Sequence, residues 1–285
     1  MSLEYTVTYS AKNAYENNVF KAFWQFCIVP EDNDTQELVQ WDFENSLNVH
    51  NGLSINGLGF RVIRVHPEMS FKTISYKAKF KVIKQEINPF DFEVNQDVEK
   101  DFNTILDIPF KTEHEPYLRK TKFTKLPLKY TSQFSFDKSK SIFDNLMELN
   151  AWTFEYIDFE TGVTDVDTTL DTIILKKNGV CQDFSHLFCA IARENHIPTR
   201  YVSGYLHQGN GYFGDSQMHA WVEAFIPHVG WMGFDPTNNL LVNQNHLKVA
   251  HGKDYSDCPP IKGVVYSDGW NKTEHSVEVQ ASQQQ

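Results

Sequence analysis

Three side chains in the second half of the chain have the types and the order of a nucleophilic catalytic triad: Cys181, His219 and Asp235. In such a triad the thiolate attacks a carbonyl carbon, the imidazole takes and returns the proton, and the carboxylate holds the imidazole tautomer and stabilises its charged form. Each residue also has an ordinary structural explanation, as a buried thiol, a strand histidine and a turn aspartate. Spacing alone therefore leaves catalytic and structural roles open.

The nucleophile candidate lies where a helix is expected to begin. Helical periodicity starts directly after Gly179 and Val180 and stops before Pro198, with the apolar residues on one face. A helix N-terminus carries partial positive charge and free N–H groups, which stabilise a thiolate and can form part of an oxyanion hole. Cys181 therefore has a reason to be reactive, whereas Cys189 falls in mid-helix and is predicted to be a small buried hydrophobe.

Strands are predicted to carry the other two residues. Residues 200–206, 218–226 and 231–235 have strand character, and a Gly-rich polar turn from His207 to Asp215 separates the first two. His219 opens the second strand, and a hairpin centred on residues 227–230 places Asp235 within about three residues of the position opposite His219. Contact between the two side chains depends on a register that the sequence does not define.

The first ninety residues have the alternating pattern of β-structure. Residues 3–9 and 74–82 alternate apolar and polar side chains, and further strands are predicted at 19–30, 38–43 and 60–66. Turns are predicted at Asn51-Gly52 and Asn56-Gly57. The lysines of residues 72–84 are interpreted as a solvated sheet face that resists edge pairing. This pattern predicts an antiparallel sandwich or barrel.

Four segments, in this order and spacing, closely resemble the transglutaminase-like superfamily, in particular its bacterial cysteine-peptidase-like branch with a β-rich N-terminal domain. They are GVCQDFSHL (179–187), IPTRYVSGYL (197–206), HAWVE (219–223) and GWMGFDPTNN (230–239). The resemblance implies Cys181 as nucleophile, His219 as general base and acid, and Asp235 as its orienting partner, on a papain-like α+β core. No triad position is substituted.

The expected fold class is therefore α+β. It begins with an antiparallel β sandwich or barrel-like domain over residues 1–95 and continues through a proline-rich connecting segment over 96–140. A papain-like transglutaminase core, with helices packed on an antiparallel sheet, follows over 141–272, with helices at 142–152 and 168–176. The polar composition of residues 273–285 predicts a disordered tail.

A second oxyanion donor is not defined by the sequence. Trp152, Tyr156 and Gln182 are candidates, although packing or capping explains each of them equally well. Asp183 is expected to interact with free N–H groups at the helix start. The sequence therefore leaves Trp152, Tyr156 and Gln182 as alternative oxyanion donors.

No metal or cofactor is predicted. Cys181, His186 and Cys189 would lie at about 0°, 140° and 80° around the helix axis, so they do not converge on one tetrahedral centre. His186 is expected to hydrogen-bond within the core, and no acidic loop has the signature of a calcium site. His246 and His251 are interpreted as surface residues.

Composition limits the partners. The chain of 285 residues has a formal net charge of −11, which disfavours binding to nucleic acid. Its apolar runs are far shorter than the roughly 18 residues that span a bilayer, so no membrane span is expected. Four scattered cysteines without a C-x-x-C pair argue against a disulfide scaffold, and the first residues lack a secretory signal, which predicts a cytoplasmic protein.

The sequence thus predicts a cysteine-dependent peptidase or amidase that cleaves a peptide or isopeptide bond of a peptide or protein substrate through an acyl-enzyme. Glutamine–lysine cross-linking is the closest alternative, because only the second nucleophile differs. A catalytically silent peptide-binding module is the alternative from another class. The oligomeric state is not indicated.

Overall fold

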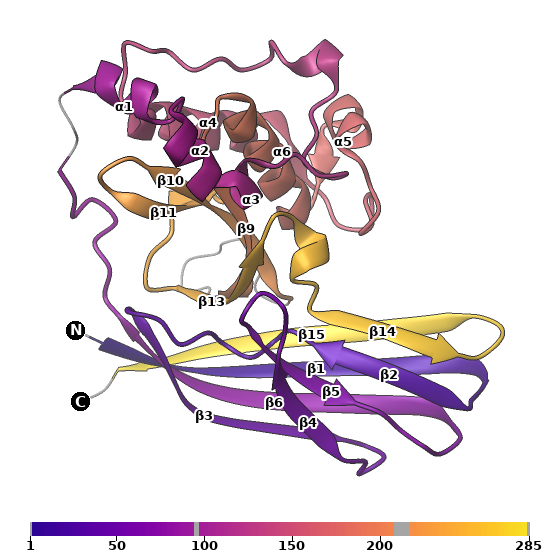
Figure 1. Cartoon of the computed structure of the whole chain (residues 1–285). Helices are drawn as coiled ribbons and strands as arrows, with labels where there is room; N and C mark the ends of the chain where they lie inside the picture. Colours follow the sequence, from indigo (N-terminus) through magenta and orange to yellow (C-terminus); the bar gives the residue numbers. More distant parts are fainter. Residues whose placement is uncertain (1, 94–96, 208–216, 284–285) are drawn as a thin grey trace.

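The computed structural model describes residues 2–93, 97–207 and 217–283, and the predicted turn after His207 lies outside them. The α+β prediction is confirmed: a β sandwich lies beneath a core of helices and a five-stranded sheet (Figure 1). Two four-stranded antiparallel sheets form the sandwich, in the orders β15-β1-β6-β3 and β14-β2-β5-β4. Their bounds are β1 Ser2–Val19, β2 Lys21–Phe26, β3 Gln36–Asn45, β4 Asn51–Ile55, β5 Arg61–Val65, β6 Phe71–Gln85, β14 Ile261–Tyr266 and β15 Asn271–Gln283.

Period-two patterning forms the two long central strands of the sandwich. Tyr5, Val7 and Tyr9 of β1 are buried at alternate positions, and five alternate apolar residues of β6 are buried in the same way. Asn56-Gly57 forms a turn as predicted, but Asn51-Gly52 begins β4 and does not form the expected turn.

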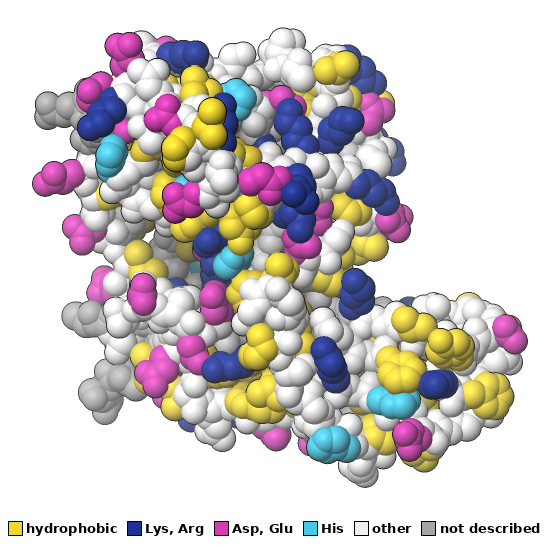
Figure 2. Space-filling view, in the orientation of Figure 1, with side chains coloured by type: hydrophobic (Ala, Val, Ile, Leu, Met, Phe, Trp, Pro, Cys, Tyr) yellow, Lys and Arg dark blue, Asp and Glu magenta, His cyan; other side chains and the backbone are white. Residues whose placement is uncertain are grey.

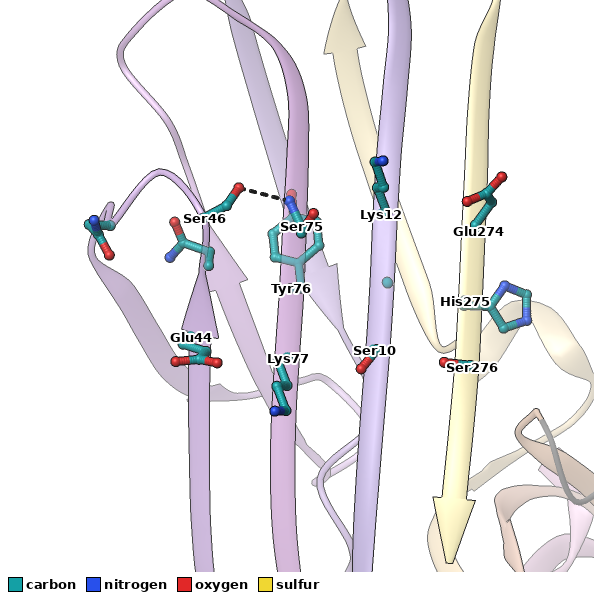
Figure 3. Close-up of a pocket in the computed structure, with 13 residues that line it drawn as sticks. Ser10, Lys12, Glu44, Ser46, Ser75, Tyr76, Lys77, Glu274, His275 and Ser276 are labelled. Atoms are coloured by element: carbon teal, nitrogen blue, oxygen red, sulfur yellow. Dashed lines mark hydrogen bonds between the residues drawn. The ribbon is translucent and has the colours of Figure 1, made fainter.

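Lys77, Lys79 and Lys81 of β6 lie on the outer face of the sheet, although β6 is not an edge strand, whereas Lys84 near the end of the strand is buried. Strand β6 pairs with β1 on one side and with β3 on the other. Lys77 lies opposite Glu44 and Lys79 opposite Asp42, which are favourable cross-strand pairs. Figure 3 shows Lys77 and Glu44 on neighbouring strands. The solvated face is therefore confirmed for Lys77, Lys79 and Lys81 and wrong for Lys84. The interpretation as edge protection is wrong because partner strands cover both edges of β6.

The C-terminal residues return to the sandwich, which corrects two predicted boundaries. Strand β15 pairs with β1 from Leu3↔Gln283 to Tyr15↔Asn271, so the disorder predicted for residues 273–285 is wrong for 273–283. Strand β14 pairs with β2, so the predicted core 141–272 ends too late. Polar composition predicted disorder wrongly here, because a strand with one solvated face can be mostly polar. Such a strand forms backbone hydrogen bonds and buries apolar side chains on its other face, as β15 buries Val277.

The core consists of a layer of helices and an antiparallel sheet of order β12-β11-β10-β9-β13. Its sheet lies between the helices and the sandwich: Tyr205 and Leu247 join the buried cluster of the sandwich, whereas Val222 and Phe234 join that of the helices. The bounds are α4 Ile142–Tyr156, α5 Leu170–Lys176, α6 Cys181–Glu194, β9 Thr199–Leu206, β10 His219–Ile226, β11 Gly230–Asp235, β12 Leu240–Leu241 and β13 His246–Gly252, with a short parallel pair β7 Asp158–Phe159 and β8 Asn178–Gly179.

The segment predicted to be a connector, 96–140, is part of the core. It forms the short helices α1 Val98–Thr104, α2 Ile108–Glu113, α3 Glu115–Leu118 and η1 Leu128–Tyr130. Pro109 and Pro116 occupy the first turns of α2 and α3, where the missing N–H has no helical partner to lose, and Pro127 directly precedes η1. Ile105 and Phe110 pack into the helical cluster. Among the described residues, no helix is both long enough and apolar enough to span a membrane.

Charged side chains of both signs are interspersed on the visible face of the molecule, which is hollowed between the helical part and the sandwich (Figure 2).

Lys84 of β6 is one of the few buried cations, with 4% of its surface exposed, and donates to the Thr35 hydroxyl at 2.9 Å. Burial and the nearby Lys248 lower the pKa of Lys84 to about 8, although Glu223 and Glu31 act in the opposite direction. The protonated side chain therefore opposes folding at neutral pH.

We expect Lys84→Met to raise the free energy of unfolding at pH 7 by about 1–3 kcal/mol, because one pKa unit corresponds to about 1.4 kcal/mol. A pKa that is lower in the folded state than in the unfolded chain makes the wild type gain stability as pH rises from about 8 to the unfolded value. The advantage of the variant should therefore shrink over that interval. Urea unfolding at pH 7 and pH 10 measures both, and a variant less stable at pH 7 would contradict the prediction.

Candidate active site

Cys181 is the first residue of α6 and is half-buried. The turn before it is held by Asp183, whose Oδ2 accepts from the Val180 N–H at 2.8 Å and from the Thr164 hydroxyl at 2.6 Å. The predicted role of Asp183 at the helix start is confirmed. Because the first N–H groups of a helix have no intrahelical acceptor, those of Cys181 and Gln182 remain available to an oxyanion.

Gly179 is required by this turn. A Cβ atom at Gly179 would lie 2.6 Å from Oδ2 of Asp183, which is closer than non-bonded atoms approach. The absence of a side chain therefore allows the carboxylate to close onto the Val180 N–H and to set the start of α6.

The β10–β11 hairpin brings His219 and Asp235 together. Val222 pairs with Phe234, so one further step in each strand places Asp235 opposite Trp221, two residues from the position opposite His219. The predicted proximity is confirmed. His219 Nε2 lies 2.8 Å from Asp235 Oδ2, and both side chains are fully buried.

Asp235 accepts hydrogen bonds from more than one element. Its Oδ1 accepts from the Thr237 N–H at 3.1 Å, and its Oδ2 accepts from the Asn238 amide at 2.8 Å. His246 Nε2 lies 3.2 Å from the same Oδ2. His246 is 1% exposed, so its interpretation as a surface residue is wrong, because β13 pairs with β9 and turns it inward. The sequence did not predict the contact of His246 with Asp235, because its only local indication is the apolar strand that begins at His246.

Charge coupling favours an ionised aspartate beside a charged imidazole. Burial alone would lower the pKa of His219, but the charge and hydrogen bond of Asp235, together with Cys181, raise it above its ordinary value. Burial alone would raise the pKa of Asp235, but His219 and His246 hold it well below its ordinary value. Nδ1 of His219 has no hydrogen-bond partner among the described residues. It is therefore the nitrogen available to the Cys181 thiol.

Cys181 and His219 share a cavity of about 510 Å³ that both parts of the fold line. Gln182 lines it from the core, and Tyr9 and His275 line it from strands β1 and β15 of the sandwich. The sandwich is thus a wall of the candidate site.

The other two oxyanion candidates lie elsewhere. Trp152 stacks on Tyr156 with 4.6 Å between ring centroids, and the Tyr156 hydroxyl donates to the Ile174 carbonyl at 3.3 Å. Neither residue lines the cavity that contains Cys181. Their helical spacing on α4 serves packing, so only Gln182 of the three candidates is at the site.

One group of side chains in the described part of the chain has metal-binding donor types: His219, Asp235 and His246, whose donor atoms lie within 4.8 Å of one another. The 2.8 Å contact between His219 and Asp235 has the length of a charge-assisted hydrogen bond, and the Asn238 amide donates to the same carboxylate oxygen. We therefore interpret this group as a hydrogen-bonded network.

His186 accepts from the Tyr255 N–H at 3.2 Å, as expected for a core histidine.

The part of the chain that carries these residues is similar to known proteins. The family model described as the transglutaminase-like superfamily matches residues 129–236. An uncharacterised protein of Mycobacterium tuberculosis is 33% identical over 146 residues, which are 48% of this chain and 46% of that protein. A protein-glutamine gamma-glutamyltransferase of Pseudomonas aeruginosa is 34% identical over 83 residues, 27% of this chain and 12% of that protein. The chain spans about half the length of the mycobacterial relative.

A crystal structure of a proposed cysteine protease from Cytophaga hutchinsonii has the same fold. It superposes with a TM-score of 0.80 at 18% sequence identity and covers 100% of this chain and 92% of that chain. The likeness therefore extends over the sandwich as well as the core.

Proposed function

Because residues 129–236 of the chain are a transglutaminase-like core, we propose that the protein is a cysteine-dependent amide-bond hydrolase with Cys181, His219 and Asp235 as its catalytic residues. The observation that carries the proposal is the position of His219, which hydrogen-bonds Asp235 through Nε2 and shares a cavity with the thiol at the start of α6. The substrate class that we propose is a peptide or protein with a peptide or isopeptide bond.

The proposed reaction moves one proton through His219. Its Nδ1 accepts the thiol proton of Cys181, and the thiolate attacks the carbonyl carbon, while Asp235 stabilises the imidazolium. The developing oxyanion faces the free N–H groups of Cys181 and Gln182. His219 then donates the proton to the leaving amine as the C–N bond breaks, which leaves a thioester. Water, deprotonated by His219, adds to the thioester and releases the carboxylic acid and the free thiol.

Acyl transfer to an amine is the second candidate, and the similarity to a protein-glutamine gamma-glutamyltransferase of Pseudomonas aeruginosa favours it. The same thioester would then be released by a lysine amine in place of water. A silent peptide-binding module remains the alternative from another class, with the sandwich wall of the cavity as its contact surface. Activation of the thiol separates both enzymes from the module.

The test is the alkylation rate of each cysteine between pH 4 and pH 10, resolved by peptide mass spectrometry. We expect Cys181 to react at pH 6 more than about tenfold faster than a free thiol with a pKa of about 8.5. Cys27, Cys189 and Cys258 should stay protected, because they are buried and burial raises the pKa of each thiol.

His219→Ala supplies the control for the imidazole. The variant should return the pH midpoint of Cys181 alkylation to that of an ordinary thiol, since the proton acceptor is gone. An ordinary midpoint in the wild type, unchanged by His219→Ala, would contradict the proposed enzyme and favour the binding module.

A further inference from the structure

His246 contacts the triad from a strand that carries none of its members. We propose that His246 is a positioning residue, which holds the Asp235 carboxylate in the orientation that aligns His219 with Cys181. The inference rests on the proposed function. It adds strand β13 to α6 and the β10–β11 hairpin, the elements that carry the three proposed catalytic residues.

Hydrogen bonding defines the tautomer of His246. Its Nδ1 accepts from the Asn243 N–H at 3.3 Å, so this nitrogen carries the lone pair. In a neutral imidazole the hydrogen then lies on Nε2, which faces Asp235 Oδ2 at 3.2 Å. His246 can therefore donate to the aspartate but cannot take a proton from it. Burial favours the neutral form and lowers the pKa of His246, although Asp235 acts in the opposite direction.

The position of His246 is enforced by packing. Its side chain is fully buried, and its ring meets that of Trp221 edge to face with 5.3 Å between centroids. Residue 246 pairs with Leu206 of β9. The charged or titratable groups that act on its pKa are Asp235, His219 and Lys84, which belong to β11, β10 and β6. A neutral donor at this place adds no second positive charge beside His219.

The donors on Asp235 Oδ2 divide into local and distant ones. Asn238 follows Asp235 by three residues, so its bond restrains the carboxylate only within its own turn. His246 ties the same oxygen to β13, which is at the far end of the sheet from β11 and β12. Three N–H groups on one oxygen, with the Thr237 N–H on the other, leave the carboxylate little freedom to rotate.

The same strand provides a matched control. His246 and His251 both belong to β13 and both line a second cavity, of about 520 Å³, between the sandwich and the core. His251 bonds the Tyr117 hydroxyl at 3.2 Å, and it is not among the described residues that hydrogen-bond Asp235. Loss of an imidazole from this strand can therefore be compared with and without loss of the bond to the triad.

The experiment measures the pH midpoint of Cys181 alkylation in full-length wild type and in His246→Leu, His246→Gln and His251→Leu. We expect His246→Leu to raise the midpoint by about one unit and to slow labelling at pH 6 about tenfold, because the unrestrained carboxylate no longer aligns His219. His246→Gln keeps an N–H donor and should stay within about twofold of the wild type, as should His251→Leu. A folded His246→Leu protein with the wild-type midpoint would overturn the proposal.

A measurement on the wild type keeps the proposal testable if His246→Leu does not fold. Imidazole 15N NMR, assigned with His246→Gln, should show His246 neutral and protonated on Nε2 from pH 5 to pH 8. Protonation on Nδ1 would overturn the proposal. Failure of the proposed function has a different signature, since wild-type Cys181 would then alkylate as an ordinary thiol whatever stands at residue 246.

Discussion

Replacing Cys181 by alanine is expected to reduce amide-bond turnover to the uncatalysed background, a loss of at least about 10⁴-fold. Without the thiol no thioester forms, and His219 has no nucleophile to deprotonate. Turnover is measured by mass spectrometry on a peptide library with and without an excess of a primary amine. Release of free acid indicates hydrolysis, whereas the amine adduct indicates acyl transfer.

Cys189→Ala is the matched control for that loss. Cys189 is buried in the middle of the same helix, so its removal tests whether any change in α6 impairs turnover. We expect the control to retain wild-type turnover apart from a modest loss of stability. Equal turnover in Cys181→Ala and the wild type would show that the triad is assigned to the wrong residues. Peptide binding that survives in Cys181→Ala would then support the binding module.

Ending the chain at residue 270 is expected to leave the protein insoluble or to lower its Tm by more than about 10 °C. The truncation removes β15, so β1 becomes an edge strand along a register that runs from Leu3 to Tyr15. It also removes the buried Val277, and it removes His275 from the wall of the cavity that contains Cys181. Thermal unfolding by circular dichroism measures the effect. A disordered tail would leave the Tm unchanged.

Two substitutions at neighbouring residues of β15 test the same strand pairing without removing the strand. Val277 is buried and faces the inside of the sandwich, whereas Glu278 is exposed. We expect Val277→Ser to lower the free energy of unfolding by about 1–3 kcal/mol and Glu278→Ser to change it by less than about 0.5 kcal/mol. Equal effects at both residues would contradict the strand.

Local patterns were sufficient to predict the elements that carry the three proposed catalytic residues. Helical periodicity after Gly179 predicted α6, and with it the place of Cys181 at a helix N-terminus. The short turn after β10 limited how far Asp235 could lie from His219. These predictions succeeded because each depends on neighbours a few residues apart, where backbone preference and side-chain period act directly.

Only the tertiary structure decided which distant segments complete the site. His246 reaches Asp235 because β13 pairs with β9, and β15 reaches the cavity because it pairs with β1 at the opposite end of the chain. A polar strand and a lone histidine have the same local pattern whether or not a partner strand covers them. Strand pairing depends on loop closure and on burial against residues far away in the chain, and these energies have no local signature.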